Sequence, residues 1–470
     1  MTTMSEAFIT VRDSQPLRVV GRISSLRGMT ALVDDLPAPI GSLVYIERRE
    51  GRGLVAGEVI AATREQAVVM VMGQTEGLRS GDAVTIQETR QSAYVGPALL
   101  GRVLNGMGEA IDGKGPVRDR VRVPLSPPPL AALARASVHQ QLVTGVRALD
   151  LMTPLGKGQR LGVFAGPGVG KSTLLGNIAK CAASDVNVIA LIGERGREVR
   201  DFLEQSLGPT GLARSVVVVA TGDEPPLMRI RAAKLACSAA EWFRGQGLDA
   251  LLMMDSVTRF AHAQRQVGLS AGEPPTTKGY TPSVFASLGL LLERAGNLQS
   301  GEGLSTNLNE TTDSRPAGSV TGLYTILVDG DDMTEPIADA ARGILDGHVI
   351  LSRKLAQRGH FPAIDVLDSV SRVANEVTDA RCGQSRRMLQ RMLAVYREVE
   401  DLIQIGAYAK GARVESDTAV EFIDKINVLL RQSTEESKPG AREKFPAALA
   451  AMHQLADEML QRVSGKVGKK

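Results

Sequence analysis

Residues 165–172 read AGPGVGKS, and this stretch decides the fold. An apolar run, RLGVFA (160–165), leads into it, and a helix-length segment, STLLGNIAK (172–180), continues from it. Its glycines let the backbone curl so that successive N–H groups point into one concavity, at a helix N-terminus whose dipole favours anions. A strand, this loop and a helix predict a phosphate-binding loop in an α/β protein, whereas the loop alone would also fit a turn that caps a helix.

Lys171 and Ser172 supply the charge and the hydroxyl that such a loop uses. Lys171 would place a positive charge on the β and γ phosphates of ATP, and Ser172 is placed to ligate Mg²⁺. The strict pattern begins with Gly, but Ala165 is small enough for the same turn. We therefore predict a nucleotide site whose loop residues are Gly166, Gly168, Val169, Gly170, Lys171, Ser172 and Thr173.

Two acidic residues follow apolar runs and are candidates for the chemistry. Asp255 comes directly after the run 250–254. A carboxylate at that edge of a parallel sheet faces the same crevice as the phosphate loop, where it can hold Mg²⁺ through water. Glu194 follows another run and could orient the water that attacks the γ phosphate. The residue types alone do not decide between Glu194 and Glu198, and they also allow a surface ion pair between Glu194 and Arg195.

The rest of the chain predicts three structural units around this site. Short apolar runs broken by Gly, Pro and Asp predict a small β-barrel. Apolar runs then alternate with helix-length segments, which predicts a parallel sheet with helices on both faces, and the last part has helical spacing. The expected α/β chain has an N-terminal segment 1–16, a barrel 17–95, a phosphate-loop (RecA-like) domain 96–374 and a helical domain 375–470. The expected strands of the sheet are 160–165, 186–193, 215–221, 250–255 and 322–328.

Composition narrows the class of protein. The chain has 55 Lys and Arg against 52 Asp and Glu, and its net charge of +3 does not argue for a nucleic-acid partner. Its three cysteines have no metal-binding spacing, so we expect buried thiols in a reducing compartment: Cys181, Cys237 and Cys382. Residues 1–16 contain no apolar core of the length that a signal peptide needs, and no later stretch has the length of a membrane span. We therefore expect a cytoplasmic protein without an integral membrane segment. Residues 296–318 are polar and unpatterned, which predicts a mobile loop.

A later stretch carries a resemblance to a known family. Residues 362–371, PAIDVLDSVS, match the signature decapeptide of the α and β chains of rotary ATPases, and the likeness covers nearly the whole chain. Several segments resemble most the ATPases of flagellar and virulence type III export. These segments are GERGREVRDFLE (193–204), PPTTKGYTPSVFASLGLLLERAG (274–296), DGDDMTEPIADAARGILDGHVILSR (329–353) and YREVEDLIQIGAY (396–408).

The resemblance implies roles for individual residues. It places Lys171 and Ser172 on phosphate and Mg²⁺, makes Glu194 the residue that activates water, and makes Asp255 the strand-end acid. It also implies that Arg372 is an arginine finger in a neighbouring subunit's site, which requires a ring. Further matches place Arg195 and Arg259 near the γ phosphate and Phe361 on the adenine ring. From the residue types alone, Phe361 would be a core residue and Arg372 a surface ion-pair partner.

The resemblance implies a homohexameric ATP hydrolase of flagellar type III protein export, at the inner face of the plasma membrane. Its implied partners are a stator protein, a central stalk, the export gate, export substrates and chaperones, although the segment 1–16 is short for a stator site and the loop 297–316 is longer than the family's. The C-terminal arginines Arg386, Arg387 and Arg391 could contact a stalk or form a solvated basic face.

Four other functions remain as alternatives. A virulence secretion ATPase would use the same chemistry. The segment GDDMTEPIADAARGILDGH (330–348) and a pI near 8.7 argue against an ATP synthase β subunit. An intact Lys171 together with Glu194 argues against a subunit that binds nucleotide without hydrolysing it. The few aromatic residues of the barrel argue against an RNA-translocating hexamer.

Overall fold

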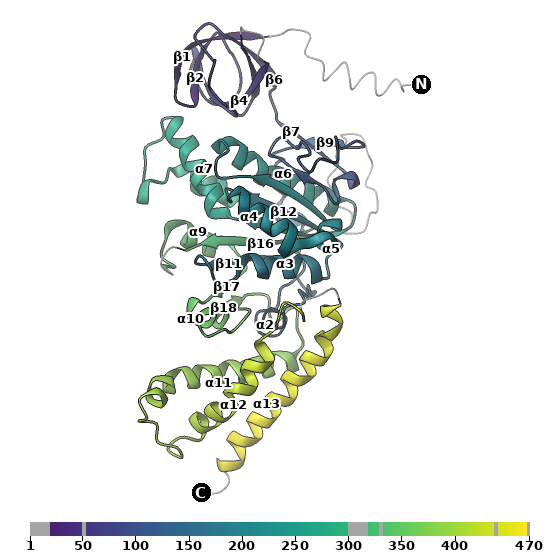
Figure 1. The fold of residues 1–470 in the computed structure, drawn as a ribbon, viewed down its shortest axis with the longest axis vertical. Coiled ribbons are helices and arrows are strands. Elements are labelled where there is room, and N and C mark those ends of the chain that lie inside the picture. Colours follow the sequence, from purple (N-terminus) through teal and green to yellow (C-terminus); the bar gives the residue numbers. More distant parts are fainter. Residues whose placement is uncertain (1–18, 49–52, 299–317, 329–331, 437–439, 468–470) are drawn as a thin grey trace.

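The computed structural model describes residues 19–48, 53–298, 318–328, 332–436 and 440–467. A barrel, a central sheet domain and a group of helices follow one another from top to bottom in Figure 1. This order confirms the predicted fold class. The predicted segment 1–16 lies outside the described residues, and so does most of the predicted loop 296–318.

The barrel is closed by six antiparallel strands in the order β1-β2-β5-β4-β3-β6. Buried and less buried side chains alternate along its strands, so Val, Ile and Ala fill the interior. The six strands are β1 Val20–Arg27, β2 Thr30–Asp34, β3 Leu43–Glu47, β4 Leu54–Ala62, β5 Gln66–Val71 and β6 Ala83–Glu88.

Short strands connect the barrel to the sheet domain. A two-stranded sheet is formed by β7 Ser92–Val95 and β9 Val121–Pro124. Between them, β8 Val103–Leu104 pairs with the edge of the central sheet. The Gly-rich region 96–116 therefore supplies an edge strand of the central sheet.

The central sheet has the strand order β18-β17-β11-β16-β14-β12-β13-β8. All neighbouring pairs from β17 to β8 are parallel, and β18 runs antiparallel to β17. Each of the five predicted apolar runs is a strand of this sheet. Its main strands are β11 Arg160–Ala165, β12 Val186–Ile192, β13 Ser215–Ala220, β14 Asp249–Asp255, β16 Ser319–Leu327, β17 Gly347–Leu351 and β18 Ile364–Ser371; β10 Arg135–Ala136 and β15 Gly296–Leu298 pair at its side.

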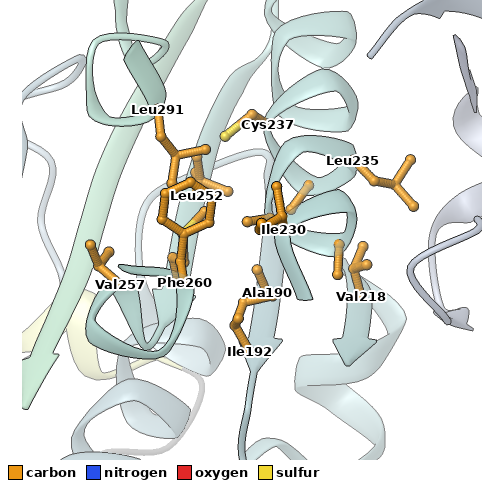
Figure 2. Packing of buried hydrophobic residues seen from close by; sticks show 14 of the residues in the cluster. Ala190, Ile192, Val218, Ile230, Leu235, Cys237, Leu252, Val257, Phe260 and Leu291 are labelled. Atoms are coloured by element: carbon orange, nitrogen blue, oxygen red, sulfur yellow. The ribbon is translucent and has the colours of Figure 1, made fainter. Parts of the chain in front are cut away.

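Both faces of the sheet are covered, which explains why strands such as β12 are nearly continuous apolar runs. Along β12, Val188 and Ala190 belong to one buried cluster and Ile189 and Leu191 to another, because successive side chains point to opposite faces. Figure 2 shows the first cluster, in which side chains of the strands meet those of α6 and α7. The buried Cys237 of α6 packs there, and the other two cysteines are also buried, as predicted.

Helices connect the strands of the sheet domain on both faces. After α4, the chain forms one π-helical turn, Phe202–Leu207, against α3. The helices of this domain are α2 Arg147–Met152, α3 Lys171–Cys181, α4 Gly196–Asp201, α5 Gly208–Ala213, α6 Pro226–Gly245, α7 Val257–Ser270, α8 Pro282–Leu292, α9 Pro336–Ile344 and α10 Arg353–Gln357.

Three long helices form the C-terminal part and pack on one another and on α2: α11 Ala380–Gln404, α12 Val414–Leu430 and α13 Phe445–Val467.

Arg386 of α11 is buried and its guanidinium donates to Thr378 Oγ1 and Asn375 Oδ1, so the prediction of a solvated basic face is wrong for this residue. Arg391 is exposed and pairs with Glu415. Within the described residues, every helix is too short or too polar to cross a lipid bilayer.

Candidate active site

The phosphate loop lies where the sequence predicts it, between the carboxyl end of β11 and the first turn of α3. Gly168 and Gly170 have φ angles of 78° and 91°, in the left-handed region that side chains rarely adopt. A Cβ at position 170 would also lie 3.7 Å from Cε1 of Phe361. The loop therefore needs glycine for its backbone angles, and its last glycine sits beside the ring of Phe361.

Lys171 reaches the end of β14. Its Nζ donates to Asp255 Oδ1 at 2.6 Å and lies 3.5 Å from Glu194 Oε1. Burial would lower the pKa of Lys171, but the charges of Asp255 and Glu194 outweigh this effect and raise it. The ammonium is therefore charged and held between two carboxylates.

Glu194 is nearly buried, with 9% of its surface exposed, and its Oε1 faces the ammonium of Lys171 at 3.5 Å without a closer hydrogen bond among the described residues. Burial, and after it the charge of Asp255, raise the pKa of Glu194 from its ordinary 4.5 to about 7. Lys171 and Arg259 act in the opposite direction, and a hydrogen bond with Glu198 adds to the rise. A carboxyl poised near neutral pH suits a group that accepts a proton during the reaction.

The structure separates Glu194 from Glu198, which the sequence could not. Glu198 lies in the first turn of α4 with half of its side chain exposed, and it pairs with Arg195 at 3.5 Å. Arg195 is 84% exposed, so its side chain does not join the group around Lys171 in this conformation. Arg259 of α7 packs its stem against Gly193, where a Cβ would lie 2.8 Å from Arg259 Cβ.

Thr325 is a residue of the site that the sequence pattern did not reveal. This fully buried residue of β16 lies between the loop-bearing β11 and the strand of Asp255. Its hydroxyl lies 2.6 Å from Asp255 Oδ1, to which it donates, and 3.2 Å from the main-chain oxygen of Met254. The strand β16 also carries hydroxyls at Ser319, Thr321 and Tyr324, so no signal in its sequence singles out Thr325.

Phe361 is exposed to 47%, so the core position that its residue type suggests is wrong. Its main-chain oxygen accepts from the N–H of Gln432, in the loop between α12 and α13. The ring is therefore an accessible aromatic face beside the phosphate loop, and its main chain is held by the C-terminal part of the chain.

Two residues of the site could hold a divalent metal ion. Ser172 is exposed in the first turn of α3, directly after the lysine that touches Asp255. A hydroxyl and a carboxylate are the oxygen donors that Mg²⁺ prefers. Two carboxylates facing one ammonium also leave an excess of negative charge, which is consistent with the raised pKa of Glu194.

Arg372 lies near the amino ends of the parallel strands, whereas the phosphate loop lies at their carboxyl ends. Its neighbour Ser371 pairs with Gly347 at the amino end of β17, whereas Ile364 pairs with Leu351 at the carboxyl end. The strand β11 has six residues, so its amino and carboxyl ends are about 17 Å apart at a rise of ~3.3 Å per residue. The structure therefore does not bring Arg372 to the Lys171 of its own chain.

The fold and this group of residues define the class of protein: a phosphate-loop, nucleotide-binding α/β protein. Residues 145–371 match the nucleotide-binding domain of the ATP synthase alpha/beta family, and residues 23–86 match its beta-barrel domain. Residues 378–454 match the T3SS EscN ATPase C-terminal domain. The chain belongs to the ATP synthase alpha/beta family.

Several curated proteins are similar over most of their length. The flagellum-specific ATP synthase of Treponema pallidum (strain Nichols) is 49% identical, over 91% of this chain and 92% of that protein. The flagellum-specific ATP synthase of Bacillus subtilis (strain 168) is 43% identical, with 93% and 94% covered. The type 3 secretion system ATPase of Xanthomonas euvesicatoria is 44% identical, with 89% and 91% covered.

A solved structure of the assembled ATPase EscN, from the type III secretion system of enteropathogenic E. coli, matches with a TM-score of 0.82 at 38% identity, over 93% of this chain and 100% of that chain. EscN in complex with its central stalk EscO matches with a TM-score of 0.81 at 37% identity, with the same shares covered. These relatives carry the names of ATP synthases and ATPases, so this member of the family is an ATPase.

Proposed function

We propose that this ATPase works as a homohexamer in flagellar type III protein export and uses Mg-ATP hydrolysis to promote the export of substrates. The Treponema and Bacillus relatives described above are flagellum-specific enzymes, which supports the flagellar assignment. The observation that carries the chemistry is the group formed by Lys171, Asp255 and Glu194 behind the phosphate loop.

Binding would use the loop and the residues around it. The N–H groups of residues 168–173 would hold the phosphates, with Lys171 neutralising the charge of the β and γ groups. Ser172 and Asp255 would hold Mg²⁺, which when bound would neutralise phosphate charge during the reaction. Phe361 would offer its exposed face to the adenine ring.

Hydrolysis would use Glu194. In its ionised form the carboxylate would accept a proton from the attacking water or orient it toward the γ phosphate. Its nearly buried carboxylate lies 3.5 Å from Lys171 Nζ. The pKa of about 7 that burial and Asp255 give it supports this role, because such a group can accept a proton near neutral pH. Arg195, directly before α4, and Arg259 of α7 would support the γ phosphate, and for Arg195 this requires the exposed side chain to turn inward.

Arg372 would complete the site of a neighbouring copy. Arg372 lies near the amino ends of the strands, out of reach of the phosphate loop of its own chain. In a head-to-tail ring, one face of each copy meets a different face of the next copy. An arginine supplied in trans stabilises the charge of the transferred phosphoryl group. We therefore propose that hydrolysis requires the assembled ring.

Mixing two inactive variants tests the ring directly. Arg372→Ala keeps its own Glu194 but lacks the finger, and Glu194→Gln keeps the finger but lacks the activating carboxylate. Each variant alone should be nearly inactive. A 1:1 mixture should recover activity, because about one interface in four then combines an intact Glu194 with an intact Arg372 in a heterologous ring. A mixture that stays as inactive as its components would overturn the trans assignment.

A virulence secretion ATPase is the second candidate, favoured by the similarity to EscN and to the Xanthomonas enzyme. Either system would place the ring at the cytoplasmic face of the plasma membrane, with a stator protein, a central stalk, an export gate, and substrates with their chaperones as partners. Complementation separates the two. The gene should restore motility to a strain without its flagellar export ATPase; rescue of effector secretion alone would favour the virulence assignment.

A further inference from the structure

The main chain of Arg372 is held by a hydrogen bond, whereas its side chain is exposed and makes few contacts. The N–H of Arg372 donates to the main-chain oxygen of Asp346 at 2.9 Å. Its guanidinium is exposed, and among the described residues it has one long hydrogen bond, of 3.5 Å, to the main-chain oxygen of Arg342. An arginine that acts on a molecule outside its own chain needs this arrangement, in which the main chain is fixed and the guanidinium is exposed.

Gln159 and Ser371 form the anchor next to Arg372. The side chain of Gln159 is fully buried, and its Nε2 donates both to the main-chain oxygen of Asp346 and to Ser371 Oγ, each at 3.1 Å. Its Oε1 accepts from the N–H of Gly156 at 2.8 Å. Ser371 Oγ in turn donates to the main-chain oxygen of Pro154 at 2.8 Å. The last residue of the signature decapeptide is thus tied to the segment that leads into β11.

The main-chain carbonyl of Asp346, which accepts hydrogen bonds from both Gln159 and Arg372, is itself fixed. The carboxylate of Asp346 accepts from the N–H, Nε and Nη2 of Arg160, each at 3.0 Å. The N–H of Asp346 donates back to the main-chain oxygen of Arg160 at 2.9 Å. Asp346 therefore cannot shift its main chain without breaking contacts to the first residue of β11.

We propose that Gln159 and Ser371 are positioning residues, which set the main chain of Arg372 so that its guanidinium meets the neighbour's nucleotide. This inference rests on the proposed function, since it assumes that Arg372 acts in trans. The physical reason is that a long side chain amplifies small rotations of its backbone, and a misplacement of about 1 Å can cost about 100-fold in rate.

A merely structural role for these hydrogen bonds predicts a different behaviour. If Gln159 and Ser371 only satisfied buried polar groups, their loss would lower stability and activity to the same degree whether or not Arg372 is present. If they position Arg372, their loss should have no further effect once Arg372 has been removed, because coupled residues are not additive. The two roles are therefore separable in a double-mutant cycle.

The experiment uses the full-length ring and the variants Ser371→Ala and Gln159→Met, each with and without Arg372→Ala. We measure kcat at saturating ATP, the affinity for a fluorescent ATP analogue, and the melting temperature. Ser371→Ala should lower kcat by about 10- to 100-fold with unchanged analogue affinity, and should leave the residual rate of Arg372→Ala unaltered. Ser371→Thr, which keeps the hydroxyl, should restore most of the rate. Gln159→Met should give the same pattern as Ser371→Ala.

Thr321→Val is the matched control at the same edge of the sheet. Thr321 is buried, and its Oγ1 accepts from the N–H of Gly158 at 2.9 Å, one residue before Gln159. Its effect on kcat should be the same in both backgrounds. Equal losses from Ser371→Ala in both backgrounds, or no loss in either, would overturn the positioning role alone. An Arg372→Ala ring with the full wild-type rate would overturn the trans assignment as well.

Discussion

Glu194 should make the protein less stable at neutral and alkaline pH, so that Glu194→Gln is a stabilising change that abolishes turnover. The carboxyl is nearly buried, and burial together with the charge of Asp255 raises its pKa from 4.5 to about 7. Because the folded pKa lies above the unfolded one, the folded protein binds more protons than the unfolded chain between these values. Stability from this group is thus complete below pH 4.5 and is lost as the pH rises through 7.

The size of the effect follows from the two pKa values. The difference between 4.5 and about 7 corresponds to about 3 kcal/mol of unfolding free energy once both states are ionised. A glutamine of the same shape never ionises, so the variant should be more stable than the wild type by up to about 3 kcal/mol at about pH 8 and equal to it near the unfolded pKa. Its amide can still donate to Glu198.

Urea unfolding at about pH 5, 6, 7 and 8 measures this difference across the titration, with single-turnover hydrolysis on the same samples. We expect kcat to fall by about 100- to 10,000-fold while nucleotide binding persists, because the phosphate loop is untouched. Glu198→Gln is the matched control: half of its side chain is exposed and a glutamine can still hydrogen-bond to Glu194, so stability and turnover should change much less than in Glu194→Gln. A Glu194→Gln protein that is no more stable than wild type under alkaline conditions would refute the reasoning about burial, and one that hydrolyses normally would refute the assigned role.

Three further substitutions test other parts of the structure. Gly176→Ala would place a Cβ 2.6 Å from the main-chain oxygen of Ser206, so it should destabilise the protein by about 1–3 kcal/mol in urea unfolding, although alanine normally favours a helix; a gain in stability would contradict this packing. Phe361→Ala should weaken ATP binding by about tenfold or more in an equilibrium titration without lowering the melting temperature, while Phe361→Tyr keeps the affinity. Arg397→Ala removes hydrogen bonds of 2.7 and 2.8 Å to Asp365. Because Arg397 is half exposed, its loss should cost only about 1 kcal/mol or less in urea unfolding, and less at high salt.

The sheet was largely predictable from the sequence, and the exceptions have physical causes. Strands such as β12 are buried on both faces, so they are nearly continuous apolar runs that stand out from the helices. By contrast, β18 is an edge strand with mixed burial, and its Asp365 and Ser369 side chains form hydrogen bonds within the strand itself, so its composition does not indicate a strand. The two residues of β8 are too few for any pattern.

The candidate site was predictable where a rule of topology applies. A carboxylate after a parallel strand must lie at the edge that carries the phosphate loop, and Asp255 does touch Lys171 there. Which of several candidate residues belongs to the site depends on burial, and the sequence does not report the burial of single residues. Glu194 and Glu198 are close in the chain with similar neighbours, yet one is nearly buried and the other is exposed. Likewise, Arg386 lies on a helix whose apolar spacing does not tell which of its arginines turn inward.

The strand β11 joins the two parts of the mechanism that we propose. At its carboxyl end the chain turns into the phosphate loop, and at its amino end Arg160 holds the residue on whose carbonyl Arg372 rests. This strand is hydrogen-bonded to a parallel strand on each side, so it cannot lengthen or bend without disrupting the sheet. The distance between a chain's own site and the arginine it offers is therefore nearly constant.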